Sequence, residues 1–154
     1  AFELGTLYFN PVGSFKKDFV KAQKYYHIAA EKGDVNAQYM LGYMYNYGHV
    51  EKDLVLAIRY FEMAAKQGHV LSAAQLALLY QIPEVHNYEK AFSYCKYAVD
   101  CGDTPSEFVL GTLYLAGRGC EPDEDKAYLC FKHAAKKGAP EALMMLRKMD
   151  EMGI

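Results

Sequence analysis

Ala134-Ala135-Lys136-Lys137-Gly138 is one of four versions of a single phrase, and the spacing of these versions decides the fold. The others are Ala29-Ala30-Glu31-Lys32-Gly33, Ala64-Ala65-Lys66-Gln67-Gly68 and Ala98-Val99-Asp100-Cys101-Gly102. Their glycines are 35, 34 and 36 residues apart. A fixed period of this length predicts a repeat architecture in which each copy is one supersecondary unit.

A second pattern follows each of these glycines. Eight residues later comes a leucine, and in three copies a small residue stands next to it and a tyrosine four positions further on. The four leucines are Leu41, Leu76, Leu110 and Leu146. Residues at this spacing share one face of an α-helix. Each copy is therefore predicted to begin with a helix whose small residue permits a close crossing.

The segment before each double alanine predicts a second helix. Ala57, Tyr60, Phe61, Ala64 and Ala65 occupy positions i, i+3, i+4, i+7 and i+8, and equivalent residues recur in the other copies. Small residues on successive turns admit a neighbouring backbone, and the aromatic pair between them fills the remaining volume. The helix is predicted to end at the glycine, which suits a left-handed C-cap.

These patterns predict an all-α fold, because strand signals are almost absent and turn residues separate the helices. One helix pair cannot bury both its apolar faces, so the pairs are expected to stack into a right-handed α-α superhelix, a solenoid of about four and a half repeats and nine helices. We expect one repeat domain over 1–154, with repeats at about 1–36, 37–71, 72–105 and 106–141 and a half repeat or cap at 142–154. The pattern starts within a copy and stops after half of one, which favours a larger array.

The run from Leu110 to Gly119, followed by Asp125-Lys126-Ala127, Phe131 and the double alanine, resembles the Sel1-like repeat (SLR), a relative of the tetratricopeptide repeat. The resemblance extends over the whole chain, although the third copy has Pro83 in place of the Gly-x-Gly turn. It implies a non-enzymatic adaptor or scaffold that assembles protein complexes.

If the first helices line the concave side, as in tetratricopeptide-like stacks, the side chains pointing into it lie two before, two after and five after each leucine. The count selects these partner-binding candidates: Phe2, Thr6, Phe9, Tyr39, Tyr43, Asn46, Ala74, Leu78, Gln81, Phe108, Thr112 and Leu115. Aromatic pockets with nearby amides suit a bound peptide or helix, with Asn46 and Gln81 bonding its backbone. The alternative is that several of these aromatics pack against the second helices.

Charge and hydropathy narrow the class of partner. The formal charge is −2, from 17 basic and 19 acidic residues, which gives no general attraction for a phosphate backbone or an anionic membrane. Apolar runs fall far short of the ~20 residues that cross a bilayer. We therefore expect a protein or peptide partner, neither nucleic acid nor membrane insertion, and possible self-association.

No pattern for metal, cofactor or catalysis stands out. The five histidines occupy unrelated repeat positions and none is paired at i and i+4, so they are predicted to be solvated or at helix ends. Cys95, Cys101, Cys120 and Cys130 match no metal-binding spacing and do not recur between copies, which predicts free thiols and slightly favours the cytoplasm. Catalytic, metal and cofactor-binding residues are predicted to be absent.

Two other functions stay open at this point. One is a structural subunit that self-associates through its repeat ends. The other is a ligand-binding or enzymatic domain with a site built between repeats, which a polar pocket with perturbed titratable groups would support.

Overall fold

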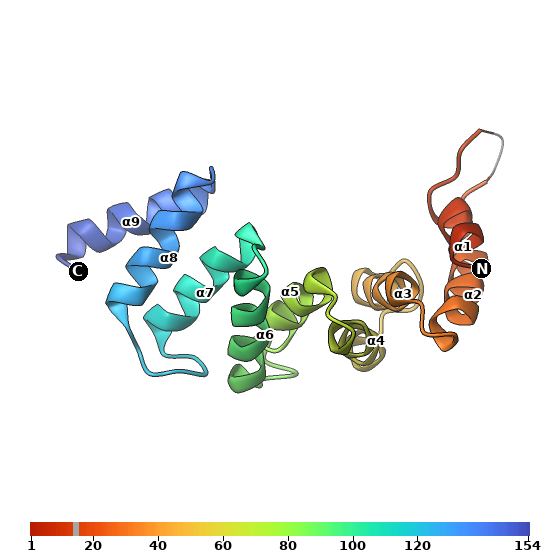
Figure 1. The fold of residues 1–154 in the computed structure, drawn as a ribbon, viewed down its shortest axis with the longest axis horizontal. Coiled ribbons are helices and arrows are strands. Elements are labelled where there is room, and N and C mark those ends of the chain that lie inside the picture. Colours follow the sequence, from red (N-terminus) through yellow and green to blue (C-terminus); the bar gives the residue numbers. More distant parts are fainter. Residues whose placement is uncertain (14–15) are drawn as a thin grey trace. The chain divides into compact units, whose positions relative to one another are not determined.

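The computed structural model describes residues 1–13 and 16–154, and this part of the chain contains nine α-helices and no strand. The helices are α1 (Phe2–Phe9), α2 (Phe19–Glu31), α3 (Val35–Tyr47), α4 (Leu54–Lys66), α5 (Val70–Leu79), α6 (Tyr88–Asp100), α7 (Thr104–Ala116), α8 (Glu124–Lys136) and α9 (Pro140–Met152). They alternate as the first and second helices of four pairs, with α9 as an additional first helix (Figure 1). The predicted all-α repeat fold is confirmed.

The chain forms two compact units, residues Ala1–Ser72 and Ala73–Ile154, which divide within α5. In the first unit α1 contacts α2, α2 contacts α3, and α3 contacts α4. In the second unit α6 contacts α7, α7 contacts α8, and α8 contacts α9. The helices α2, α6 and α8 thus lie against the first helix of the next pair, which is how stacked pairs cover each other's apolar faces.

Each second helix begins at a side-chain N-cap. The capping residues are Asp18, Asp53, Asn87 and Asp123, and each accepts a hydrogen bond from the backbone N–H three residues later. Such a cap satisfies one of the amides that a helix start leaves unpaired, and replacing it with alanine costs about 1 kcal/mol. These Asp and Asn residues therefore fix where each second helix starts.

The loop inside each pair varies in length but closes with the same hydrogen bond. The N–H of the capping residue donates to the carbonyl of the tyrosine near the end of the preceding first helix. The bonds run from Asp18 to Tyr8, Asp53 to Tyr45, Asn87 to Tyr80 and Asp123 to Tyr114, at 2.8–3.2 Å. The same closing hydrogen bond therefore forms in the longer loop of the first pair and in the shorter, Pro83-containing loop of the third.

The second helices end as predicted. The glycine after the last helical residues has a positive φ, between 87° and 92°, at Gly33, Gly68, Gly102 and Gly138. Residues with a Cβ rarely adopt this conformation, so glycine turns the chain sharply into the next first helix.

In three pairs, a glycine of the first helix packs directly against an aromatic ring of the second helix. A Cβ placed on Gly5, Gly42 or Gly111 would lie 2.6–2.7 Å from the ring of Tyr26, Phe61 or Phe131, respectively. All three rings are fully buried. Glycine in the first helix therefore lets the second helix approach closely enough for its ring to lie on the backbone.

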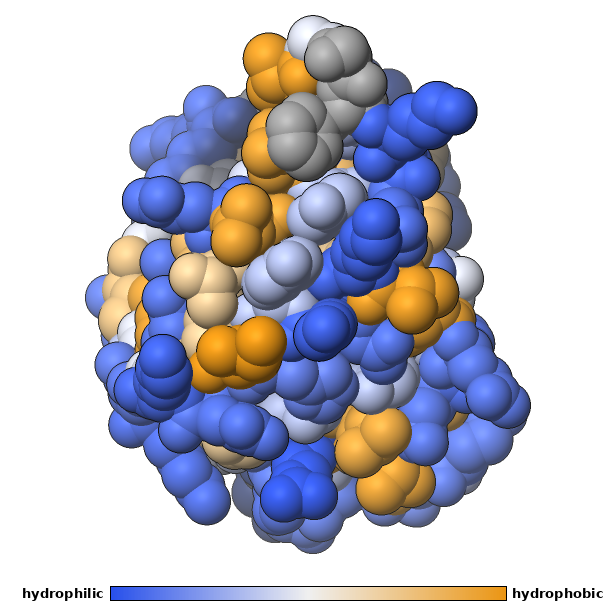
Figure 2. Space-filling view, turned by 90° about the vertical axis from the view of Figure 1, so that its right-hand side faces the viewer, coloured by the Kyte–Doolittle hydropathy of each residue, from blue (hydrophilic) through white to orange (hydrophobic). Residues whose placement is uncertain are grey.

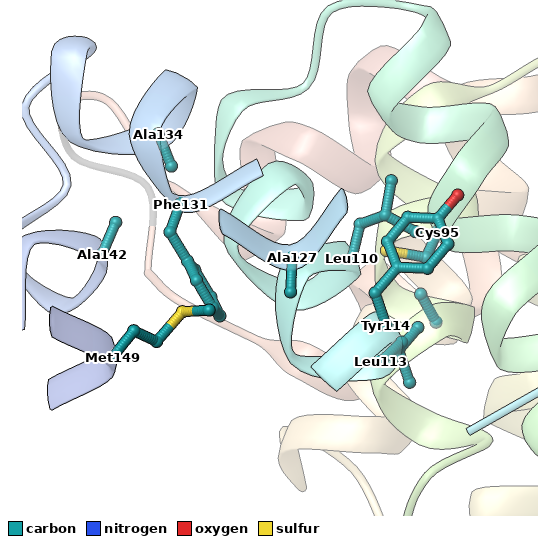
Figure 3. Close-up of a cluster of buried hydrophobic side chains, with 10 residues drawn as sticks. Cys95, Leu110, Leu113, Tyr114, Ala127, Phe131, Ala134, Ala142 and Met149 are labelled. Carbon is teal, nitrogen blue, oxygen red and sulfur yellow. The ribbon is translucent and has the colours of Figure 1, made fainter. Parts of the chain in front are cut away.

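The third pair achieves the same packing with a different combination. Ala77 occupies the glycine position and Cys95 the ring position, and both are buried in one cluster with Leu110, Tyr114 and Phe131. Figure 3 shows how Cys95 and the labelled members from α7, α8 and α9 fill this cluster. The added methyl of the alanine is accommodated because the partner side chain is smaller.

The first-helix tyrosine has a ring partner of its own in three pairs. Tyr8 stacks on Tyr25, Tyr45 on Tyr60 and Tyr80 on Tyr94, with interplanar angles of 2–4°. A lysine ammonium lies 5.2–5.5 Å from the ring centroids of Tyr8, Tyr80 and Tyr114, supplied by Lys21, Lys90 and Lys126. The Lys-Ala element of the motif thus covers the tyrosine ring with a cation and places the alanine in the core.

Among the described residues, no helix has both the length and the apolar character needed to cross a membrane.

Candidate functional site

We call the predicted partner-binding residues of the two units, taken together, the first-helix face: Phe2, Thr6, Phe9, Tyr39, Tyr43, Asn46, Ala74, Leu78, Gln81, Phe108, Thr112 and Leu115. All but one lie within α1, α3, α5 or α7. The exception is Gln81, because α5 ends at Leu79 and Gln81 stands in the turn that follows.

A half-buried aromatic ring recurs at one position of this face. Phe2 lies on Tyr26, Tyr39 on Phe61 and Phe108 on Phe131, with ring centroids 5.6, 5.8 and 5.6 Å apart. Each of these three rings is partly buried and partly open to solvent. Each ring therefore packs against a second helix, as in the core interpretation, and is also partly open to solvent, as the partner-binding interpretation requires.

The first unit joins several of these rings into a cluster. Tyr43 lies 6.2 Å from Tyr39 and 6.3 Å from Phe9 between ring centroids. His49 packs 5.0 Å from Phe9 and 5.3 Å from Tyr43. Tyr47, which is about half exposed, lies 4.5 Å from Tyr43 and extends the cluster outward. The count from the leucines had not included His49 or Tyr47, although a run of aromatics at the end of α3 is visible in the sequence.

The polar members bond mainly to their own helices. The Thr6 hydroxyl donates to the Phe2 carbonyl at 3.1 Å, and the Thr112 hydroxyl donates to the Val109 carbonyl at 2.7 Å. The Gln81 amide donates to the Ala77 carbonyl at 2.8 Å. The Gln81 amide thus gives one hydrogen bond to α5, and its bonding to a peptide backbone stays a prediction.

The second unit carries the remaining members. Leu78 is 48 % exposed, whereas Leu115 is half-buried against the core cluster. A pocket of about 500 Å³ adjoins Phe108, and its lining residues are Thr104, Pro105, Phe108, Val109, Lys137, Gly138, Ala139 and Glu141. The pocket therefore lies beside the first turns of α7 and α9.

One histidine, His27, departs from the solvated or helix-end expectation. His27, in the middle of α2, lies within hydrogen-bond distance of the Tyr45 hydroxyl (3.3 Å) and the Tyr60 hydroxyl (3.1 Å), and so links α2 to α3 and α4. Burial lowers the pKa of His27, an effect partly opposed by Glu31.

His69 does lie at a helix end, where it acts as the N-cap of α5. Its Nδ1 accepts from the Ser72 N–H at 3.2 Å, the bond that Asp34 and Asp103 provide for α3 and α7. Burial lowers the pKa of His69. Its position directly after Gly68, where Asp34 follows Gly33, was the signal in the sequence for this capping role.

The cysteines are free thiols, as predicted. Cys95 is buried and donates to the Ser106 carbonyl at 3.3 Å. Burial raises the pKa of Cys95 to about 12 and that of Cys130 to about 11. Both are therefore protonated at neutral pH and lack the thiolate character of a reactive cysteine. The part of the chain that the structure describes holds no cluster of three or more His, Cys, Asp or Glu side chains suited to a metal ion.

The model of the Sel1 repeat family matches four consecutive segments, residues 1–34, 35–69, 70–103 and 104–138. The chain belongs to the Sel1 repeat family. Proteins of this family generally act as protein-interaction scaffolds, and their fold is typically non-enzymatic. The last matched segment ends at Gly138, just before α9. Within α9, Arg147 and Asp150 replace the small residue and the tyrosine of the pattern.

Solved Sel1 repeat structures share the fold. A protective antigen present in uropathogenic Escherichia coli strains, which displays an SLR fold, is 28% identical with a TM-score of 0.88 over 99% of this chain and 33% of its own. A Sel1 repeat protein from Oxalobacter formigenes is 29% identical with a TM-score of 0.86 over 96% of this chain and 60% of its own. This chain therefore spans between a third and about three fifths of the length of these relatives.

Cysteine rich protein B of Helicobacter pylori is similar in fold alone, at 24% identity and a TM-score of 0.60 over 87% of this chain and 98% of its own.

Proposed function

We propose that this Sel1 repeat chain is a scaffold that binds a peptide or a partner protein on its first-helix face. The observation that carries the proposal is the recurring half-buried ring, Phe2, Tyr39 and Phe108, at one position in three pairs. Each ring is held in place by a buried aromatic of the second helix and still has an edge in solvent. Rigid aromatic side chains contribute much binding energy for little lost conformational entropy.

The surroundings of these rings support a protein partner. In the first unit, exposed Tyr47 adds apolar area and Asn46 adds a polar group, and in the second unit exposed Leu78 adds apolar area. Charged side chains are absent from the twelve residues of the face. A surface of aromatic and aliphatic groups with a few polar ones is typical of the centre of a protein interface, where charges are depleted.

The test compares two variants that carry the same added charge. The first has Thr6→Glu, Tyr43→Glu and Leu78→Glu on the first-helix face. The second has Val20→Glu, Val55→Glu and Leu129→Glu on the second helices, where the side chains are 73 %, 77 % and 53 % exposed. Proteins captured by the wild type and quantified by mass spectrometry should be lost from the first variant and retained by the second. Equal capture by both variants would reject the first-helix face, provided that circular dichroism shows both to be folded.

A structural subunit is the second candidate, because α9 exposes several apolar side chains. Leu143, Met144 and Met152 are each close to half exposed or more. By contrast, the face shown in Figure 2 is mostly hydrophilic, with separate apolar patches. Association through α9 predicts a mass in solution that rises with concentration and returns to that of the monomer in the Met144→Lys variant.

A further inference from the structure

In the second pair, the position equivalent to the pocket beside Phe108 is occupied by a side chain of the protein itself. There the His69 ring lies on Tyr39, the aromatic equivalent to Phe108. Tyr39 and Phe108 both stand two residues before the leucine of their first helix. The imidazole of His69 lies against Tyr39, with ring centroids 4.9 Å apart. Ala139 holds the position of His69, directly after the glycine that ends the second helix. Phe108 consequently has no such ring upon it, and a pocket is present.

The same replacement changes the start of the following helix. His69 caps α5 through its Nδ1, and Asp34 and Asp103 cap α3 and α7 with their carboxylates. The N-cap of α9 is Ala139, which has no capping side chain. Ala139, which follows the last pair, thus supplies neither the ring nor the helix cap that His69 supplies after the second pair.

Size and lining suit one large apolar side chain. The pocket volume of about 500 Å³ falls in the range of sites that bind small molecules, about 300–1,000 Å³. Pro105, Phe108 and Val109 supply apolar surface, and Thr104 lies at the first turn of α7. Phe108 packs against the buried Phe131, which fixes the position of the Phe108 ring in the pocket lining.

The charges at the rim argue against an anionic occupant. The Lys137 ammonium lies 2.9 Å from Glu107 Oε1 and is neutralised by it. Glu141, in the first turn of α9, supplies the carboxylate of the lining. With Lys137 paired to Glu107, the Glu141 carboxylate is the unpaired charge that the lining offers, which favours an uncharged group whose edge donates a hydrogen bond.

We propose that this pocket is an anchor site for an uncharged aromatic side chain of a protein partner, preferentially tryptophan, whose ring lies on Phe108 as His69 lies on Tyr39. The indole N–H supplies a donor toward the carboxylate-bearing rim. The assignment rests on the proposed scaffold function, and it specifies one residue type that the partner contributes. Tryptophan in a preformed pocket is a common anchor of protein interfaces.

The test uses N-acetyl-L-tryptophanamide as the probe and follows the methyl NMR signals of Thr104 and Val109. The wild type should bind the probe with a Kd in the millimolar range, about what one side chain provides. Ala139→His reproduces the second pair and should weaken binding at least about tenfold. Ala139→Asn supplies a cap to α9 but no ring, so it is the matched control and should bind as the wild type does.

Charge provides a second comparison. N-acetyl-L-tryptophan, which carries a free carboxylate, should bind more weakly than the amide. Equal affinity of the Ala139→His and Ala139→Asn variants, tighter binding of the carboxylate, or shifts that spare Thr104 and Val109 would each overturn the assignment.

Probe binding is measured without any partner, so it is independent of the capture experiment. Failure of the probe to bind overturns the pocket, whereas unchanged capture by the first-helix-face variant overturns the scaffold proposal.

Discussion

Gly111 lies directly beneath the Phe131 ring, where a Cβ would be only 2.7 Å from the nearest ring carbon. The ring is fully buried and is also in contact with Phe108, so it has little freedom to move away. A glycine within a helix costs about 1 kcal/mol relative to alanine. The close approach of α7 and α8 is what offsets this cost in the native fold.

Gly111→Ala is therefore expected to lower the free energy of unfolding. Overpacking typically costs about 1–3 kcal/mol, which exceeds the roughly 1 kcal/mol that alanine gains in helix propensity. In a Phe131→Cys background the same change should become neutral or stabilising, because the third pair combines Ala77 with Cys95. Urea unfolding of the four proteins in this double-mutant cycle gives the coupling free energy between positions 111 and 131. Equal effects of Gly111→Ala in both backgrounds would contradict the packing account.

Glu107 offers a stabilising substitution. It is buried, and its Oε2 has no hydrogen-bond partner while its Oε1 accepts from Lys137. The equivalent Gln38 donates from its amide to the Ala30 carbonyl at 3.4 Å and accepts from Gln67 at 2.8 Å.

Glu107→Gln should thus raise the free energy of unfolding by about 1 kcal/mol. Satisfying a buried polar atom is worth about 1–3 kcal/mol, whereas a half-exposed ion pair contributes up to about 1 kcal/mol. Chemical denaturation measures the difference. Glu107→Ala, which leaves Lys137 unpaired and opens space, serves as the destabilised comparison, and a loss of stability in the glutamine variant would refute the argument.

The His69 cap makes stability depend on pH. Burial lowers the pKa of His69 in the folded chain, so the unfolded chain binds a proton at a higher pH than the folded one. The contribution of neutral His69 is fully present above its ordinary pKa of about 6.5 and is lost as pH falls through the lowered folded value. Protonation removes the Nδ1 acceptor and places a positive charge at a helix N-terminus.

His69→Asn keeps a capping side chain that does not titrate, so this variant should lose less stability than the wild type as pH falls below about 6.5. Thermal unfolding between neutral and mildly acidic pH measures the effect. His27, whose pKa is also lowered, is present in both proteins and cancels in the comparison. If the stability of the wild type and of His69→Asn falls equally with pH, His69 is not the cap described.

Thiol reactivity should follow burial. Cys101 is exposed, whereas Cys95 is buried with its pKa raised to about 12. A disulfide reagent such as DTNB at neutral pH should modify Cys101 first and leave Cys95 unmodified until the chain unfolds. Peptide mapping after timed quenching identifies the sites. Early modification of Cys95 would mean that the cluster in which Ala77 replaces glycine opens readily.

Most of the fold was predictable because its determinants are local. The spacing of Leu110, Gly111 and Tyr114 along one helix face, and the glycine after each second helix, are set by helix geometry and by the left-handed cap. The partner of each glycine was not predicted, since the contact of Gly111 with Phe131 joins two helices whose relative orientation a single pattern does not define.

Partner binding on the first-helix face stays a prediction, but the structure shows where the residues selected by the count lie. Counting from the leucines located Tyr39 and Phe108, yet it extended α5 to Gln81, although that helix ends at Leu79. The pocket beside Phe108 depends on what Ala139 lacks, and this becomes evident only when His69 is seen to cover the equivalent ring.

The central claim, that partners bind on the first-helix face, is tested most directly by hydroxyl-radical footprinting of the chain with and without a captured partner. Binding should reduce oxidation of Tyr43, Tyr47 and Leu78, which are at least partly exposed in the free chain. Val20, Val55 and Leu129 on the second helices should be oxidised equally in both states. Protection of these second-helix side chains, with Tyr43 and Leu78 unchanged, would contradict the account.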